Sequence, residues 1–298
     1  MPALALLFNA LVWGLSWYPL RQLRALHWHP LWATAVIYLL ILAGALVLLR
    51  RALRDVQQLP ALAALALAAG LTNTGFNWAT ATGDVVRVVL LFYLMPLWSV
   101  LLAWALLGER PHLPALLRMA LALAGVAIVL KTPGREWPLP ASLPDWLGVG
   151  AGFCFALTNV MLQRTRAASG RLRALAMFAG CTVVPGVGAL AGSLLQQLPW
   201  PPAPAMPGWL LWAGLWGLGV IGANIALQYG AVRLSASAVS VIMLSEVLFA
   251  SASSVAAGAA TLSGRVLLGG ALVMLGALWA ALSPADRRQR PRPAAEHP

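Results

Sequence analysis

Charge is scarce in this sequence, and acidic charge scarcest of all. Only 9% of the 298 residues are charged while 61% are hydrophobic, which gives a mean hydropathy of +0.81. A soluble globular domain carries about 25% charged residues, so the composition excludes a water-soluble fold. The 8 acidic residues are outnumbered by 20 basic ones.

Motifs that carry catalysis or energy coupling are also missing. The sequence has no phosphate-binding loop of the GxxxxGK[ST] type and no HExxH, which excludes an ATP-driven pump of that type and a zinc peptidase of that type. Its four histidines fall in predicted loops or in the tail, and Cys154 and Cys181 fall in apolar runs without metal-ligand spacing. We therefore expect no catalytic residues, no metal and no cofactor, and hence no enzyme.

Long apolar runs fill most of the chain. Crossing a bilayer takes about 20 mostly apolar residues. The first run has neither a basic start nor a small-residue cleavage site, so it is expected to be a retained helix. The sequence predicts an all-α polytopic membrane protein with ten transmembrane helices, at residues 3–20, 31–49, 60–81, 85–107, 113–130, 145–163, 172–194, 208–230, 235–257 and 264–282.

The basic residues are unevenly divided between the two sides. With a cytoplasmic N-terminus, thirteen arginines fall on the inner side and six lysines or arginines on the outer side. This is the positive-inside pattern, so both termini are expected in the cytoplasm and the protein in the bacterial inner membrane. The basic tail, residues 284–298, is expected to contact anionic lipid headgroups, and no nucleic-acid partner is expected.

The two halves of the chain, residues 1–141 and 142–283, resemble each other. Gly14 aligns with Ala156, Pro96 falls opposite Glu246 within one residue, and Gly125 aligns with Gly276. The offset drifts only from about 142 to about 151, which favours a duplication. Because each half holds five helices, an odd number, the second half must be inverted. Inverted repeats are typical of transporters that alternate access to a central site.

One carboxylate, Glu246, lies at the centre of an otherwise uncharged run. An ionisable residue at the bilayer centre costs roughly 2.5–3.5 kcal/mol, so it is expected to face the bundle interior. Three interpretations stay open: the carboxylate binds the ammonium of a substrate, it exchanges a proton during transport, or it is a structural acid bonded to a neighbouring helix.

Neutral polar and aromatic residues accompany this acid at membrane depth. Each could instead serve only as an interhelical hydrogen bond or as packing. Together they suit a cavity for a small molecule with an aromatic or apolar body and a polar head. No lysine or arginine lies near a helix midpoint, which disfavours phosphorylated substrates. The predicted substrate-binding residues are Asn9, Trp13, Ser16, Trp17, Asn73, Asn77, Trp78, Tyr93, Asn159, Asn224, Gln228, Tyr229, Ser245 and Glu246.

Two segments resemble a known family. LMPLWSVLLAWALLGE, residues 94–109, and LSEVLFA, residues 244–250, are similar to the paired signatures of the EamA-type drug/metabolite transporters, and most similar to the YddG-type aromatic amino-acid exporters. The resemblance implies a cavity built from the first, third, fourth, sixth, eighth and ninth helices. The sequence departs from the pattern at Val247, where proline is frequent, and at Ala259, where the first repeat has Glu109.

The expected function is export of aromatic or other neutral amino acids and related small metabolites by alternating access. The alternative is a multidrug exporter of aromatic organic cations. A membrane-embedded enzyme would need a nucleophile and a base, which the sequence does not offer, and the duplication disfavours a non-transporting scaffold.

Pro96 deprives a backbone carbonyl of its helical partner and is a predicted gating bend. Expected partners are the small-molecule substrate and membrane lipid; proton coupling and oligomeric state are left open.

Overall fold

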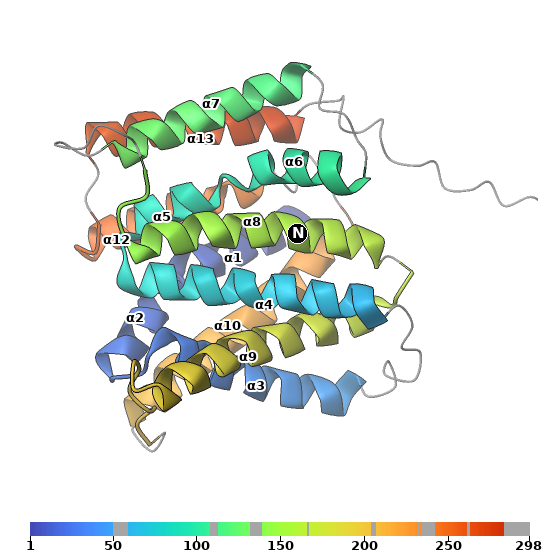
Figure 1. Ribbon diagram of the computed structural model, residues 1–298, viewed down its shortest axis with the longest axis vertical. Helices are drawn as coiled ribbons and strands as arrows, with labels where there is room; N and C mark the ends of the chain where they lie inside the picture. Colours follow the sequence, from blue (N-terminus) through green and yellow to red (C-terminus); the bar gives the residue numbers. More distant parts are fainter. Residues whose placement is uncertain are drawn as a thin grey trace, which may run out of the picture.

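A computed structural model of the chain describes nine stretches of it. They are residues 1–49, 59–107, 113–131, 139–165, 167–203, 207–231, 233, 242–260 and 263–282. Within these residues all regular structure is helical, arranged as a bundle of long, roughly aligned helices (Figure 1). The basic tail 284–298 lies outside the described residues.

Seven helices come from the first half of the sequence, and they follow the predicted runs closely. They are α1 (Pro2–Leu15), α2 (Trp17–Ala25), α3 (Pro30–Leu49), α4 (Leu59–Thr82), α5 (Val85–Phe92), α6 (Met95–Leu107) and α7 (Leu113–Leu130). The second half contributes α8 (Leu143–Arg164), α9 (Gly170–Leu194), α10 (Pro207–Ala231), α12 (Ser245–Ala256) and α13 (Gly264–Leu282).

Eight helical stretches are long and apolar enough to cross a membrane, which confirms eight of the ten predicted runs. Two of these stretches combine a pair of helices, α1 with α2 and α5 with α6. Of the predicted ninth run the described part is α12 with a few preceding residues, and the tenth run holds a shorter apolar stretch in α13, Gly264–Trp279. The count of ten and the inverted arrangement stay predictions.

Helices α5 and α6 are separated by a turn at Tyr93 and Leu94, and Pro96 is the second residue of α6. A proline has no N–H, so residue 96 cannot donate to the carbonyl of Phe92, and the helix is interrupted there. A similar one-residue interruption occurs at Leu244, where α12 begins with Ser245. The two interruptions are 150 residues apart, the offset that the repeat alignment predicts for this region.

Small residues let the helices approach closely, as they commonly do in membranes. Helix α4 packs on α8 and α9, α1 packs on α10 and α12, and α7 packs on α13 (Figure 1). A methyl group on Gly14 would lie 2.9 Å from the carbonyl oxygen of Glu246. One on Gly152 would lie 2.5 Å from the carbonyl oxygen of Phe92. Glycine at these positions therefore brings α1 against α12, and α8 against the end of α5.

Candidate functional site

The carboxylate of Glu246 and the hydroxyl of Tyr93 meet inside the bundle. The Tyr93 oxygen lies 3.2 Å from Glu246 Oε2 and 3.2 Å from the carbonyl oxygen of Met243. Both side chains are buried, with 7% of Glu246 and 2% of Tyr93 exposed. The phenol has one hydrogen, which it donates to either acceptor. Tyr93 lies in the turn that ends α5, and Glu246 is the second residue of α12, just after the interruption at Leu244. The pair therefore joins the end of α5 to the start of α12.

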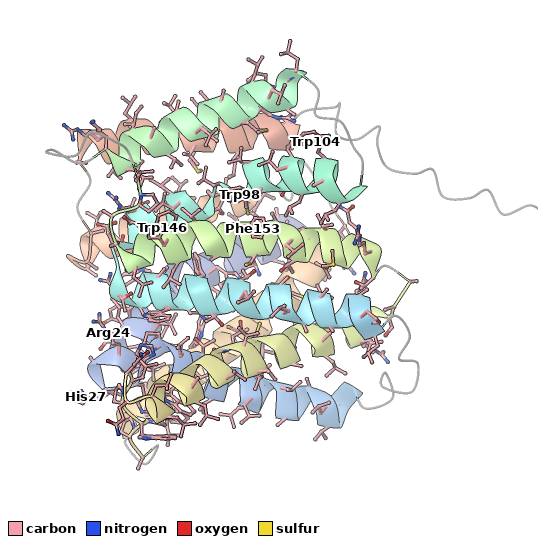
Figure 2. All side chains as sticks on the ribbon, in the orientation of Figure 1. Arg24, His27, Trp98, Trp104, Trp146 and Phe153 are labelled. Atoms are coloured by element: carbon pink, nitrogen blue, oxygen red, sulfur yellow. The ribbon has the colours of Figure 1, made fainter. Side chains whose placement is uncertain are left out.

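Aromatic rings pack around this pair. Phe92 lies with its ring centre 4.8 Å from that of Phe76, 5.4 Å from that of Phe155 and 6.0 Å from that of Tyr93. Trp98 stands edge-on to Phe153 at 5.6 Å, between α6 and α8 (Figure 2). The partner of the acid, Tyr93, is thus part of a cluster of rings suited to an aromatic or apolar body.

The first two helices bring Trp13, Ser16 and Trp17 toward the same core. Trp17 donates its indole N–H to Ser253 of α12 at 3.0 Å, and Trp13 packs edge-on to Trp216 at 5.5 Å. Ser16 is 2% exposed, and its hydroxyl has no hydrogen-bond partner among the described residues. It is a buried polar group that a bound molecule could satisfy.

The side-chain amides of Asn73 and Asn77 in α4 contact helix α3. Asn73 accepts a hydrogen bond from the Tyr38 hydroxyl at 2.8 Å, and Asn77 donates to the Thr34 hydroxyl at 3.3 Å. The two asparagines therefore share a helical face, as their spacing predicts, and that face meets α3. Trp78 lies edge-on to His29 at 5.0 Å. These contacts match the interhelical hydrogen-bond alternative for Asn73 and Asn77.

The remaining predicted residues are dispersed. Asn9 donates to the Ala223 carbonyl at 2.7 Å, which ties α1 to α10. Asn224 and Ser245 donate within their own segments, to the carbonyls of Val220 and Ile242. Tyr229 is 41% exposed, with the Arg233 guanidinium 3.9 Å from its ring centre, and Asn159 is half-buried. The side chains of Gln228 and Pro96 lie outside the described part of the structure.

Two amide oxygens stay available in the interior. Asn9 Oδ1 and Asn77 Oδ1 are buried without a hydrogen-bond partner among the described residues. Each side chain donates one N–H elsewhere, and its oxygen could still accept a bond from a donor such as an ammonium group.

An ion pair that the sequence analysis missed joins α5 to α8. Arg87 contacts Asp145 at two points, Nε to Oδ1 at 2.8 Å and Nη2 to Oδ2 at 2.9 Å. Asp145 also accepts the Ala141 N–H, and Arg87 donates to the Val129 carbonyl. The sequence signals only the place of Asp145 at a helix start, because Ser142 and Asp145 have the spacing of a helix-capping pair and Ser142 does cap α8.

A second missed feature is a pocket of about 460 Å³ where α2 and α4 end. Its lining includes two arginines, Arg21 and Arg24, together with Ala25, Ala81 and Thr82. Nearby, His29 has its pKa lowered below the ordinary value, first by burial and second by the positive charge of Arg24.

Among the described residues no three histidine, cysteine or acidic side chains group together as metal ligands would.

Comparison with protein families gives one match: residues 1–131 match the EamA-like transporter family. This match indicates a membrane solute transporter, and the apolar helices indicate a multi-pass membrane protein. A search of curated proteins finds no match.

Fifteen chains of solved structures are similar to this protein. One of them, titled only "Crystal structure of protein", has a TM-score of 0.57 and 20% sequence identity. The alignment covers 97% of this chain and 99% of that one. The two proteins therefore share a fold over nearly their whole lengths.

Proposed function

We propose that the protein exports neutral amino acids, aromatic ones in particular, by alternating access around the Glu246–Tyr93 pair. The observation that carries this proposal is the position of that pair. A buried carboxylate and a phenol meet beside two helix interruptions, and the Tyr93 ring packs on Phe92, which in turn contacts Phe76 and Phe155. A site with one acid and several ring faces suits an ammonium group attached to an aromatic body.

The packing of α7 on α13 supports an inverted duplication. A methyl group on Gly125 would lie 2.6 Å from the Gly269 carbonyl, and one on Gly276 would lie 3.4 Å from the Arg118 carbonyl. Gly125 and Gly276 are 151 residues apart, and so are Arg118 and Gly269. Exchanging the two helices therefore reproduces the contact, as a two-fold axis between equivalent repeats requires.

The proposed setting is the inner membrane of a bacterium, with both termini in the cytoplasm. The excess of arginine in alternate loops and in the tail supports this orientation. The similarity of residues 94–109 and 244–250 to YddG-type signatures supports amino acids as substrates.

Export of aromatic organic cations is the second candidate, because a carboxylate among aromatic rings serves a cation equally well. Replacing Glu246 by glutamine keeps the side-chain shape and removes the charge. Cation transport should then collapse, whereas transport of zwitterions held mainly by amides and rings should survive in part.

The test is uptake into proteoliposomes of a panel of amino acids and organic cations, with and without a pH gradient. Wild type, Glu246→Gln and the matched control Asp84→Asn are compared, since Asp84 caps α5 outside this pair. Aromatic amino-acid uptake lowered only by Glu246→Gln supports the proposal. If no compound in the panel is transported, the proposed function is wrong.

A further inference from the structure

The pocket between the ends of α2 and α4 carries positive charge without a matching acid. Arg21 and Arg24 line it, and neither forms an ion pair with any carboxylate among the described residues. Asp84 acts on Arg21 through its charge but does not line the pocket, and its side chain accepts the Arg87 backbone N–H. The pocket therefore offers an anion two guanidinium groups and no carboxylate in its lining.

The two arginines are held in place but keep donors free. Arg21 donates to the carbonyls of Thr80 and Gly83, and its guanidinium stacks 5.1 Å from the Trp17 ring centre. Arg24 uses Nη1 for the Ala81 carbonyl at 3.3 Å. A guanidinium has five N–H donors, so Arg24 retains N–H groups that an oxoanion could accept.

The pocket lies at the depth of lipid headgroups. The membrane-spanning stretches that border it end at Ala25 and Thr82, so the pocket is at the membrane boundary. Arg24 is exposed at this end of the bundle, near the turn that holds His27 (Figure 2). Beside the arginines, the ring of Tyr18 is 41% exposed and packs edge-on to Trp17 and Trp212. Exposed aromatic rings at this depth are typical of a lipid contact.

We propose that this pocket binds the phosphate of an anionic phospholipid headgroup. The phosphodiester oxygens accept hydrogen bonds from the free N–H groups of Arg24 and Arg21, and the acyl chains lie along the exposed rings. The volume of about 460 Å³ is within the range of small-molecule sites and accommodates a glycerophosphate group. This site is separate from the Glu246–Tyr93 pair and does not depend on the transported substrate.

The experiment is native mass spectrometry of the delipidated full-length protein in detergent. The protein is titrated with phosphatidylglycerol, with phosphatidylcholine of the same chains, and with inorganic phosphate as a competitor. Wild type should bind one phosphatidylglycerol more tightly than phosphatidylcholine. Arg24→Gln should weaken that binding about fivefold, since one arginine near an anionic lipid contributes about that factor.

Two further variants complete the design. Arg265→Gln removes the same charge from an exposed arginine outside the pocket, so it should bind lipid as wild type does. Ala25→Trp fills the pocket from an exposed position without changing charge, so it should weaken binding as well. Equal affinity of wild type, Arg24→Gln and Ala25→Trp would overturn the proposal. So would displacement of the lipid by inorganic phosphate at equal concentration, because the site would then bind a free anion.

Discussion

Arg87 and Asp145 hold α5 and α8 together through two parallel hydrogen bonds of 2.8 and 2.9 Å, across 58 residues of sequence. Only 4% of the Asp145 side chain and 22% of the Arg87 side chain are exposed. A fork of this kind is directional as well as strong, because both guanidinium N–H groups must point at both carboxylate oxygens.

Asp145→Asn should lower the free energy of unfolding by about 2 kcal/mol, since it leaves a partly buried guanidinium without its counter-charge. Thermal unfolding in detergent measures the loss, and Arg265→Gln is the control for a change of one exposed charge. The exchanged pair Arg87→Asp with Asp145→Arg should recover part of the stability. If Asp145→Asn unfolds at the wild-type temperature, the ion pair contributes nothing.

Tyr93→Phe removes the hydroxyl that faces Glu246 and keeps the ring. We expect a loss of roughly 1–2 kcal/mol in stability and a clear reduction in transport. Tyr38→Phe is the matched control, because that equally buried hydroxyl bonds Asn73 outside the proposed site. Uptake assays on both variants separate the two effects. Equal transport by Tyr93→Phe and wild type would exclude a role for the hydroxyl in binding.

Pro96→Ala should restore a backbone N–H after the turn at Tyr93 and Leu94 and favour a continuous helix. If the interruption gates the cavity, the transport rate should change while expression stays normal. The rate of substrate uptake into proteoliposomes, normalised to inserted protein, checks this. An unchanged rate in well-expressed protein would reject the gating role.

Gly180→Ala should destabilise the bundle by about 1–3 kcal/mol or more, because the added methyl group would overlap the Ala66 carbonyl of α4. Gly150→Ala is its control: it is also helical, but no atom lies within 4 Å of the added group. That variant should be neutral or gain up to about 1 kcal/mol from helix propensity. Melting temperatures of the two purified variants test the difference, and equal melting would contradict the close α4–α9 contact.

His29 introduces a pH dependence outside the membrane-spanning helices. Its folded-state pKa lies below the ordinary value of 6.5, so folding favours the neutral ring. The unfolded chain therefore takes up a proton more readily, and this contribution to stability is lost as the pH falls through about 6.5. His29→Gln should flatten the decrease in melting temperature between pH 8 and pH 5.5. An identical decrease in both proteins would show that other groups cause it.

Much of the fold could be predicted because apolar length alone determines which segments span a membrane. The burial of Glu246 was predictable for the same reason, since a carboxylate avoids lipid. Its contact with Tyr93 was not, because the two residues are 153 positions apart and only tertiary packing brings them together.

The spacing of residues along a helix predicts less than the tertiary contacts of those residues, as α4 and α8 show. The spacing of Asn73 and Asn77 gives their common face, but it does not say that α3 covers that face. Arg87 and Asp145 lie at helix ends, where arginine and aspartate are ordinary interfacial residues, so composition gave no reason to pair them. Tyr229 lies beside a polar cluster in the sequence, yet its ring contacts Arg233 one turn away.

The ion pair between Arg87 and Asp145 also distinguishes the two related halves of the chain from each other. In a perfect inverted duplication, a two-fold rotation would interconvert the two conformations, which would then have equal free energy. At the offsets of the repeat, the counterparts of Arg87 and Asp145 are Ala238 and Ala3, neither of which carries charge. The ion pair therefore joins the starts of α5 and α8 without a charged equivalent in the other half. Given the proposed duplication, this difference makes the two conformations unequal in free energy.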